Sequence, residues 1–421
     1  MSPGHSSTTW TRNPLTGLLL AAVAIRLITL YSLGSIEDAR GLTPWEWGWE
    51  SAALGDAWLN RGVYGDPFGV ETGPSGWLTP PYPLFLAGLF HVFGGVNESS
   101  ALALFLIQTL VSALTCILVV HLGRAMKTPR AGIAAGWLLA FHPLSIWLAV
   151  VRVWDTTFMA LALVTLLLAI TRAGPRPSVQ RAAGIGLLYG LVLLLNPAPL
   201  TLAPIVAYYY AAGPARENLI RIGTVLACAL LVTLPWMVRN LSVLGSPGLR
   251  TNFGVELYSG NHGAASGRVN MDLHPASPDN TDEYRELGEV AYARERQEEA
   301  IGWISDHPEA FSRLSIRRVR LFWIGEDPRL DPRESGGVGS AYATHAWIKW
   351  AVFMGSGILG LLGAVLVRQR SREAWLVVGT LALFPIPYYL THISERYRYP
   401  IEPIVLLAAC WWLERTRTKK A

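Results

Sequence analysis

The chain has 421 residues, of which 51% are hydrophobic and only 15% charged. Soluble domains carry about 25% charged residues, so this composition excludes an ordinary soluble enzyme and indicates a protein that crosses the membrane several times. The net charge of +5 does not indicate a nucleic-acid partner, because the basic residues lie in short connections between apolar runs and not in one patch.

Long apolar runs follow one another along the chain, and about 20 such residues are the length that a helix needs to cross the hydrocarbon core. We therefore predict an all-α membrane protein with about ten transmembrane helices. The runs lie at 14–33, 101–122, 131–149, 155–171, 183–195, 199–212, 221–238, 346–367, 374–391 and 401–414. One further run, Pro80 to Gly94, is short and begins with prolines. We expect it to be an interfacial or re-entrant helix.

Charge in the connections predicts the orientation of these helices. With the amino terminus in the cytoplasm, every cytoplasmic connection is rich in Lys or Arg, as the positive-inside rule requires. These connections are 123–130, 172–181, 213–221, 368–372 and 415–420. Both termini are then predicted to be cytoplasmic, in the inner (plasma) membrane.

The same orientation defines three predicted domains. Residues 1–238 form a transmembrane core that includes a first outer loop (34–100). Residues 239–345 form a small helical subdomain on the outer face, and residues 346–421 contain the last helices and a basic cytoplasmic tail. The three cysteines each lie in an apolar run, so we expect no disulfide and no cysteine metal site.

The first outer loop combines carboxylates with tryptophans at the membrane surface. Glu46 and Glu50 are four residues apart, so a helix would place them on one face, and Asp56 lies roughly on the same side. A carboxylate that is partly desolvated beside Trp49 and its neighbouring tryptophans suits a general base. The alternative is a belt of interfacial tryptophans with solvated acids.

Further polar residues fall on the same predicted side. Arg152 and Asp155 occupy a turn that is either a local ion pair or a phosphate or sugar contact. Two arginines, Arg396 and Arg398, could hold a lipid phosphate through their N–H groups, or could anchor the last helix. Arg26 lies inside the first run, where it either faces a phosphate, snorkels or pairs with an acid. No histidine pair has metal-ligand spacing, so we assign no metal ligand, and dependence on a divalent metal stays open.

A series of short motifs along nearly the whole chain resembles the bacterial members of glycosyltransferase family 39. These are GT-C enzymes related to protein O-mannosyltransferases and lipid A aminoarabinose transferases. The motifs are Trp49-Glu50, Leu59 to Tyr64, Thr72-Gly-Pro74, Pro80-Pro-Tyr-Pro83 to Phe93-Gly94, Asn196-Pro197, Pro235 to Asn240, Asn252 to Asn261 and Glu395 to Pro400.

The resemblance implies an inverting transfer of a sugar from a polyprenyl-phosphate donor to a glycan, lipid or protein hydroxyl on the extracytoplasmic face. The family's acidic pair is Asp-Glu, and here the Asp position is Trp49, so only Glu50 carries over as the base, before Glu46 and Asp56. Expected ligands of the donor phosphate are Arg396, Arg398, Arg152, Arg239 and Arg26. Expected substrate contacts are Trp49, Tyr82, Asp155, Asn261, His262, His392 and Glu395.

Two other functions remain open at this level. A lipid-linked sugar flippase or other transporter would spread charges through the middle of several helices. A polysaccharide ligase or polymerase would place its key residues in a late outer loop and would not need Glu50.

Overall fold

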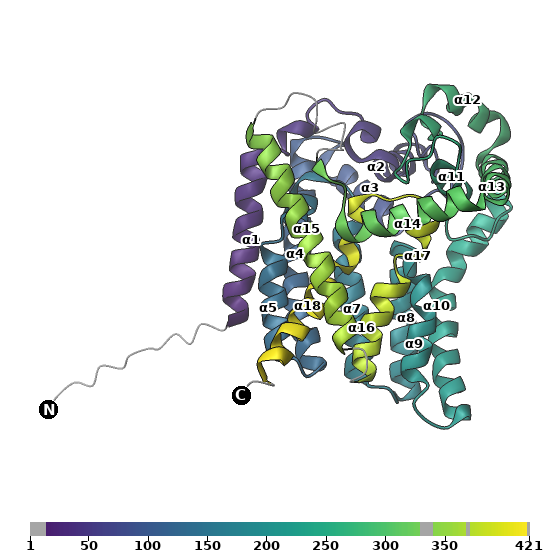
Figure 1. Ribbon diagram of the computed structural model, residues 1–421. Helices are drawn as coiled ribbons and strands as arrows, with labels where there is room; N and C mark the ends of the chain where they lie inside the picture. Colours follow the sequence, from purple (N-terminus) through teal and green to yellow (C-terminus); the bar gives the residue numbers. More distant parts are fainter. Residues whose placement is uncertain (1–13, 329–339, 368–370, 419–421) are drawn as a thin grey trace.

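The computed structural model describes residues 14–328, 340–367 and 371–418, and these residues form helices with no β-strand among them (Figure 1). The bundle of long helices stands upright in Figure 1. Helix α1 (Pro14–Leu33) begins and α18 (Glu402–Thr418) ends at its lower end. The predicted all-α membrane architecture is confirmed.

Six helical segments of the described residues are long and apolar enough to cross a membrane. They are α1, α4 (Glu98–Ala125), α7 (Thr156–Ala173), α10 (Ala215–Leu244), α15 (Ser340–Val367) and the continuous pair α16 (Arg372–Leu383) and α17 (Ile386–Leu390). A bent pair, α5 (Pro129–Ala140) and α6 (Pro143–Val151), makes seven if it is one span.

The remaining predicted spans coincide with shorter helices. They are α8 (Val179–Leu195), the turn Ala198–Leu202 continuing into α9 (Ala203–Tyr210), and α18. Each of the ten predicted runs is thus helical. Among the described residues, however, only six or seven of these helical segments are long and apolar enough to cross a membrane.

Prolines set the breaks inside the bundle. Pro143 begins α6 directly after His142, where the chain bends by 51° between α5 and α6. A proline has no N–H for the preceding helical turn and disfavours a helical conformation at the residue before it, so α5 must stop here. Pro197 follows the end of α8 in the same way.

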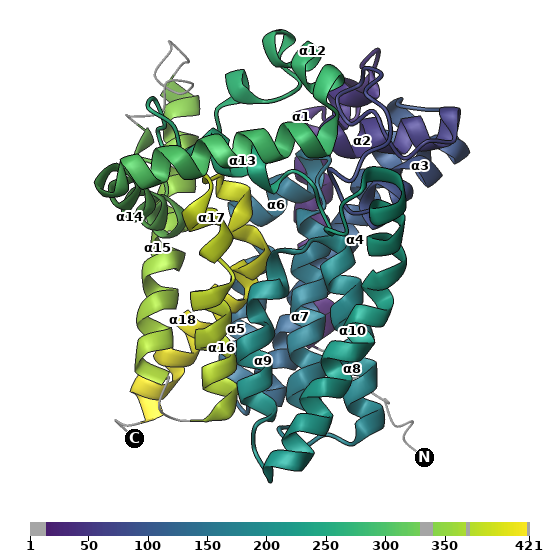
Figure 2. The same ribbon diagram turned by 90° about the vertical axis from the view of Figure 1, so that its right-hand side faces the viewer.

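Six shorter helices cover the upper end of the bundle, as Figures 1 and 2 show. They are α2 (Pro44–Arg61), α3 (Pro81–Phe93), α11 (Phe253–Gly260), α12 (Pro278–Leu287), α13 (Glu289–Asp306) and α14 (Pro308–Ile324). Helix α3 is the short apolar run that was expected not to cross, and it packs against α2 at this end.

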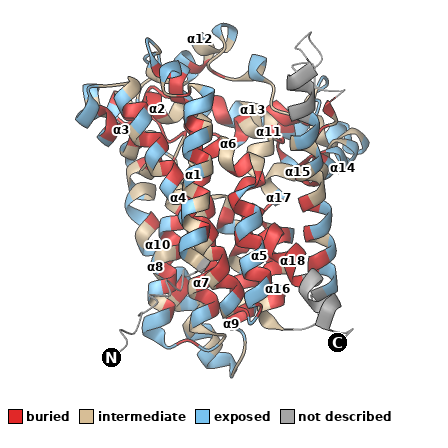
Figure 3. Cartoon of the chain, turned by 90° about the vertical axis from the view of Figure 1, so that its left-hand side faces the viewer, coloured by how far each residue is buried: buried red, intermediate tan, exposed pale blue. Residues whose placement is uncertain are grey.

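Burial follows the pattern of a membrane protein. Buried residues gather between the helices, and exposed residues lie on the outward faces of the helices (Figure 3). Many of the exposed residues are large and apolar. On α10, for example, Leu219 is 74% and Leu231 62% exposed. Such a surface suits lipid and not water. On the inner side, Gly186 and Gly190 of α8 let the backbone of α10 approach so closely that a Cβ would collide with it.

Candidate functional site

Glu50 is positioned by a break in helix α2. The helix starts with a capping box in which Thr43 and Glu46 bond each other's backbone and side chain. It is interrupted at Gly48 and Trp49, and Trp49 has φ 53° and ψ −144°, a conformation that strains any residue with a side chain. Glu50 therefore begins a second helical section, whose N-terminus favours a negative charge.

The break at Gly48 depends on close packing. A Cβ at this glycine would lie 2.6 Å from the Cβ of Ala52 and 2.8 Å from a methyl of Val153. Val153 belongs to the connection between α6 and α7. The absence of a side chain at Gly48 thus lets the first loop seat Glu50 against the turn that carries Arg152 and Asp155.

The carboxylate of Glu50 faces a histidine from a distant part of the chain. Nε2 of His274 lies 3.2 Å from Oε1 of Glu50, and the two side chains are 13% and 22% exposed. Burial raises the pKa of Glu50, but the hydrogen bond from His274 and the positive charge of Arg396 outweigh it and hold this pKa below its usual value. At neutral pH Glu50 is therefore ionised and able to accept a proton.

Arg396 also acts electrostatically on this carboxylate, from a 3-10 turn, Glu395–Tyr397, that follows α17. Its guanidinium stacks on Trp154, 4.4 Å from the ring centroid, and on Tyr397 at 5.3 Å. Burial lowers the pKa of Arg396, but Tyr397 and Glu50 more than compensate, so its pKa is raised. The residue keeps its positive charge beside Glu50.

A chain of hydrogen-bonding groups leads away from Arg396. The hydroxyl of Tyr397 lies 2.9 Å from Nε2 of His392, whose Nδ1 is 3.4 Å from Oε2 of Glu256. Asn252 donates to the other carboxylate oxygen of Glu256 at 2.9 Å. Burial lowers the pKa of His392, and Glu256 only partly opposes this effect. The predicted residue His392 thus belongs to the same cluster as Arg396.

Asp155 joins the cluster from the start of α7. Asn196 donates to its Oδ2 at 3.1 Å, and Nη2 of Arg250 lies 3.7 Å from the same oxygen. Asp155 also lies within electrostatic range of Arg396 and of Tyr82. The hydroxyl of Tyr82 is buried and has no hydrogen-bond partner among the described residues. It is a candidate polar contact for a substrate.

Cations and tryptophans continue along the rim formed by α6, α15 and the Arg396 turn. Arg152 lies over Trp147 at 4.5 Å and over Trp154 at 5.1 Å. Lys349 forms an ion pair with Glu395 at 2.7 Å and also faces the ring of Trp147. The structure therefore brings together the predicted residues Glu50, Asp155, Arg152, His392, Glu395 and Arg396, with Tyr82 close by. We call this set, with His274, the rim site.

Two predicted arginines lie instead inside the bundle. Arg26 is fully buried, and it donates to the hydroxyls of Ser112 and Ser145 at 2.9 and 2.8 Å. It also donates to the carbonyls of Ala22 and Ala140 at 2.9 and 3.1 Å. These contacts join α1, α4 and the break between α5 and α6.

Arg398 has a similar setting. It is fully buried and donates to the carboxylate of Glu402 at 2.7 Å and to the carbonyls of Trp323 and Phe353, each at 2.8 Å. Nε2 of His142 lies 3.3 Å from Oε1 of Glu402. The guanidinium thereby joins α14, α15 and α18.

The other predicted residues hold backbone in place or lie at the surface. Arg239 donates to the carbonyls of Ser75 and Tyr64 at 2.6 and 2.9 Å and so fastens the first loop to α10. Asn261 is fully buried and bonds the carbonyls of Leu257 and Leu390, both at 2.8 Å.

Four predicted residues remain. Glu46 caps α2, Asp56 accepts from Asn60 at 2.8 Å, and Trp49 packs edge-on against Trp45 with its ring partly exposed. His262 is half-buried next to Tyr258. Because α2 breaks between Glu46 and Glu50, the helical spacing that linked these two acids does not apply.

Sequence reasoning missed one member of the rim site, His274, and three residues that contact its members. Arg250 and Asn196 contact Asp155, and Lys349 contacts Glu395. No local motif marks His274, Arg250 or Lys349, and Asn196 belongs to a motif that assigns it no contact. His274 is the most informative omission, because it is the group in direct contact with Glu50.

Among the residues described here, no group of three or more His, Cys, Asp or Glu side chains could hold a metal ion. The neighbours of Glu50 are a histidine and an arginine, and a guanidinium is not a metal ligand.

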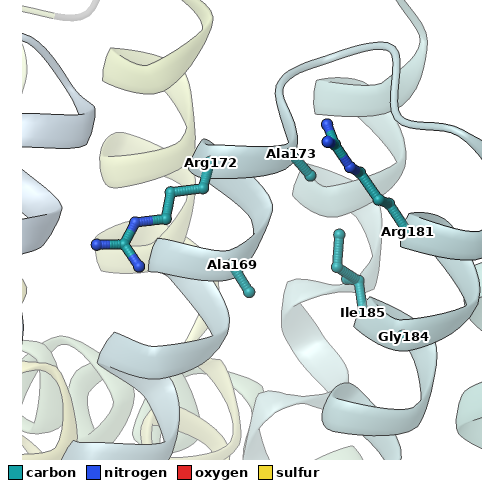
Figure 4. A pocket seen from close by; sticks show the side chains of 6 residues that line it. All are labelled: Ala169, Arg172, Ala173, Arg181, Gly184 and Ile185. Atoms are coloured by element: carbon teal, nitrogen blue, oxygen red, sulfur yellow. The ribbon is translucent and has the colours of Figure 1, made fainter.

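One cavity lies at the lower end of the bundle, far from the rim site. It has a volume of about 360 Å³ and is lined by Ala169, Arg172, Ala173, Arg181, Gly184 and Ile185 (Figure 4). These residues come from the end of α7 and the beginning of α8, whereas Asp155 precedes the start of α7. The length of α7 separates the two places by about 27 Å. In Figure 4 the Arg172 side chain points away from the other lining residues.

Comparison with known proteins gives a fold but no sequence family. No family model matches the chain, and no curated protein matches it. Its fold is similar to that of an oligosaccharyltransferase from Archaeoglobus fulgidus in the apo form, with a TM-score of 0.55 and 15% identity, over 98% of this chain and 51% of that one.

Two further structures of the archaeal enzyme are similar to the chain. The complex with an inhibitory peptide and a dolichol-phosphate has a TM-score of 0.51 and 14% identity, over 96% of this chain and 50% of that one. The form tethered with an acceptor peptide containing the NVT sequon has a TM-score of 0.52 and 16% identity, over 97% and 50%. The chain spans about half the length of these proteins. Its fold is GT-C-like, as expected, and the likeness does not single out glycosyltransferase family 39.

Proposed function

We propose that the chain is an inverting membrane glycosyltransferase that moves a sugar from a polyprenyl-phosphate donor to an acceptor hydroxyl. The observation that carries this proposal is the pairing of an ionised, half-buried carboxylate, Glu50, with a fixed cation, Arg396, at one end of a GT-C-like bundle. A similar fold binds a dolichol-phosphate in the archaeal oligosaccharyltransferase, which supports a lipid-linked donor here.

In the proposed reaction Glu50 acts on the acceptor, and the arginines of the rim site act on the departing phosphate. Glu50 takes the proton of the acceptor hydroxyl as its oxygen attacks C1 of the sugar. The bond between C1 and the phosphate oxygen breaks on the opposite face, which inverts the anomeric carbon, and the phosphate leaves as a monoester anion. Arg396 and Arg152 stabilise this departing charge by electrostatic attraction.

The remaining members of the site suit the sugar. Asp155, His392 and Glu395 can exchange hydrogen bonds with sugar hydroxyls, and the buried hydroxyl of Tyr82 can do the same. The exposed part of Trp49 and the rings of Trp147 and Trp154 offer apolar faces for the sugar ring or the first prenyl units. Arg26, Arg239, Arg398 and Asn261 are left out of this proposal, because protein acceptors already occupy their donors.

The proposal places the rim site on the extracytoplasmic face of the plasma membrane. The basic connections 123–130, 172–181 and 213–221 join the ends of helices opposite the rim site, and the positive-inside rule assigns that end to the cytoplasm. The acceptor is then a protein, glycan or lipid hydroxyl outside the cytoplasm. Assignment to glycosyltransferase family 39 is part of the same proposal.

The test is release of undecaprenyl phosphate by the purified, reconstituted protein from a panel of undecaprenyl-phosphate sugars. Wild type, Glu50→Gln and Asp56→Asn are run side by side with membrane extract as the acceptor source. We expect sugar-dependent release that falls at least about a hundredfold in Glu50→Gln, the scale for loss of a general base, and that is kept in Asp56→Asn, which alters an acid of the same helix.

Release that Glu50→Gln leaves unchanged would contradict the role of Glu50. Absence of release from every donor would contradict the transferase and favour a transporter of lipid-linked sugars.

A further inference from the structure

Two histidines in the segment between α10 and α12 make the same local turn. The backbone N–H of Ala264 donates to Nδ1 of His262 at 3.3 Å, and that of Ala276 donates to Nδ1 of His274 at 3.1 Å. A ring nitrogen that accepts a backbone N–H cannot carry a proton itself. Each neutral ring therefore bears its hydrogen on Nε2.

The two rings differ in what this Nε2–H faces. Nε2 of His262 has no hydrogen-bond partner among the described residues. Nε2 of His274 lies 3.2 Å from Oε1 of Glu50. In both histidines the turn thus leaves the Nε2–H free to donate. Between these two, it is the Nε2–H of His274 that points at Glu50, the candidate base.

Aromatic rings on several sides fix the orientation of the His274 ring. Its centroid lies 5.3 Å from that of Phe68, 5.6 Å from that of Trp77 and 6.3 Å from that of Trp45. The first two rings meet it nearly edge to face, at 81° and 82°. The imidazole therefore has little freedom to flip and present its other nitrogen.

The segment that carries His274 is also fastened to the first loop. Glu289, at the start of α13, accepts from the hydroxyls of Ser75 and Tyr284 at 2.6 and 2.7 Å, from the backbone N–H of Gly76 at 2.6 Å and from the hydroxyl of Thr251. This buried carboxylate holds the loop and the helices α12 and α13 in one register. The segments that carry Glu50 and His274 are therefore held together by several buried hydrogen bonds besides the Glu50–His274 contact.

We infer that His274 is the positioning residue of Glu50: its fixed Nε2–H holds Oε1, so that Oε2 is the oxygen that takes the proton of the acceptor. This inference rests on the proposed function. Residues 245–324 then contribute to the active centre, because they carry His274.

The charged and titratable groups that face Glu50 are few. His274 comes from the turn before α12, and Arg396 and Tyr397 come from the turn after α17. Asp155 in turn acts electrostatically on Arg396. Loss of the His274 donor would leave Arg396 as the cation that lowers the pKa of Glu50. The pKa of Glu50 should then rise.

The test compares three variants in the release assay across pH. His274→Phe keeps a ring among the aromatic neighbours and removes the donor, His274→Gln keeps an N–H donor, and His262→Phe is the matched control with the same local turn. We expect kcat/KM of His274→Phe to fall about 10- to 100-fold, the range for a group that orients a reacting residue, and its acidic limb to move to higher pH.

His274→Gln should keep more than about a tenth of the activity with an unmoved limb, and His262→Phe should behave as wild type. An acidic limb that does not move in His274→Phe, or a Gln variant as poor as the Phe variant, would overturn the inference. A merely structural defect would lower the rate of folded enzyme without shifting this limb.

A second readout needs no activity. The infrared band of the protonated Glu50 carboxyl, identified by its loss in Glu50→Gln, is followed across pH in wild type and in His274→Phe. We expect the band to appear at higher pH in His274→Phe. If no sugar donor reacts but the band shifts, the proposed function is wrong and the interaction between His274 and Glu50 is confirmed. If the band does not shift, the pair is wrong whatever the activity.

Discussion

Arg396 and Arg398 stand two residues apart in the same turn, yet they belong to two different regions of the molecule. Arg398 points into the bundle, where it is fully buried and its N–H groups bond Glu402, Ser356 and two carbonyls. Arg396 lies at the rim, half-buried on the face of Trp154, with its charge directed at Glu50.

These two environments distinguish an arginine that holds the fold from an arginine that can hold a ligand. A buried guanidinium whose donors are all taken by protein oxygens has no N–H left for a phosphate. A guanidinium stacked on an aromatic ring at a partly open edge is charged, oriented and accessible.

The largest effect is expected at the buried arginine. Arg398→Met leaves Glu402 fully buried without its main cation, and loss of one partner of a buried pair costs about 3–5 kcal/mol. We expect the free energy of unfolding in detergent to fall by this amount. The double variant Arg398→Met/Glu402→Gln should recover a large part of the loss. Equal stability of Arg398→Met and wild type would show that Arg398 does not stabilise the fold.

The rim arginine should affect chemistry and leave stability unchanged. Arg396→Gln removes the cation that faces the departing phosphate, so release of undecaprenyl phosphate should fall about 100-fold or more. Its thermal unfolding should match that of wild type. If Arg396→Gln unfolded at a lower temperature than wild type but released undecaprenyl phosphate at the normal rate, Arg396 would hold the fold and would have no part in the chemistry.

A smaller effect concerns the pH dependence of stability at the rim. Burial lowers the pKa of His392 below its usual value of 6.5, so as the pH falls below 6.5 the unfolded chain takes up this proton before the folded chain does. Stability should therefore decrease on acidification, by about 1.4 kcal/mol for each unit by which the pKa is lowered. His392→Gln should flatten this slope in unfolding curves recorded between pH 7 and about pH 5. An unchanged slope would show that other groups produce it.

The smallest effect is expected at Glu46. This residue bonds the hydroxyl and the backbone N–H of Thr43 in the capping box of α2, and Gln can make the same bonds. Glu46→Gln should therefore keep release within about twofold of wild type, as surface substitutions outside the site usually do. A loss as large as that of Glu50→Gln would make Glu46 part of the chemistry after all.

Much of the fold followed from the sequence, because the period of apolar runs and the positions of prolines are local features. The break at Pro143 lay inside a run that was predicted to be one span, 131–149, since apolar character alone does not show where a helix bends. The short run beginning at Pro80 was expected not to cross, and α3 lies beside α2 at the upper end. The three predicted domains and the orientation in the membrane stay predictions.

The candidate site was less accessible from the sequence. Dense polar motifs such as the one from His392 to Arg398 mark the neighbourhood of a site, but they do not tell Arg396 from Arg398, because only packing decides which side chain is buried. His274 is 224 positions from Glu50 in the numbering of the chain, and no local pattern predicts that the two meet. The roles of these residues stay proposals.

The most direct test of the central claim is the comparison of wild type with Glu50→Gln in a single donor-turnover measurement. We predict release of undecaprenyl phosphate that depends on the attached sugar and falls at least about a hundredfold in Glu50→Gln, with unfolding of the two proteins indistinguishable. Equal release by both proteins would contradict the claim that Glu50 is the base of a glycosyltransferase.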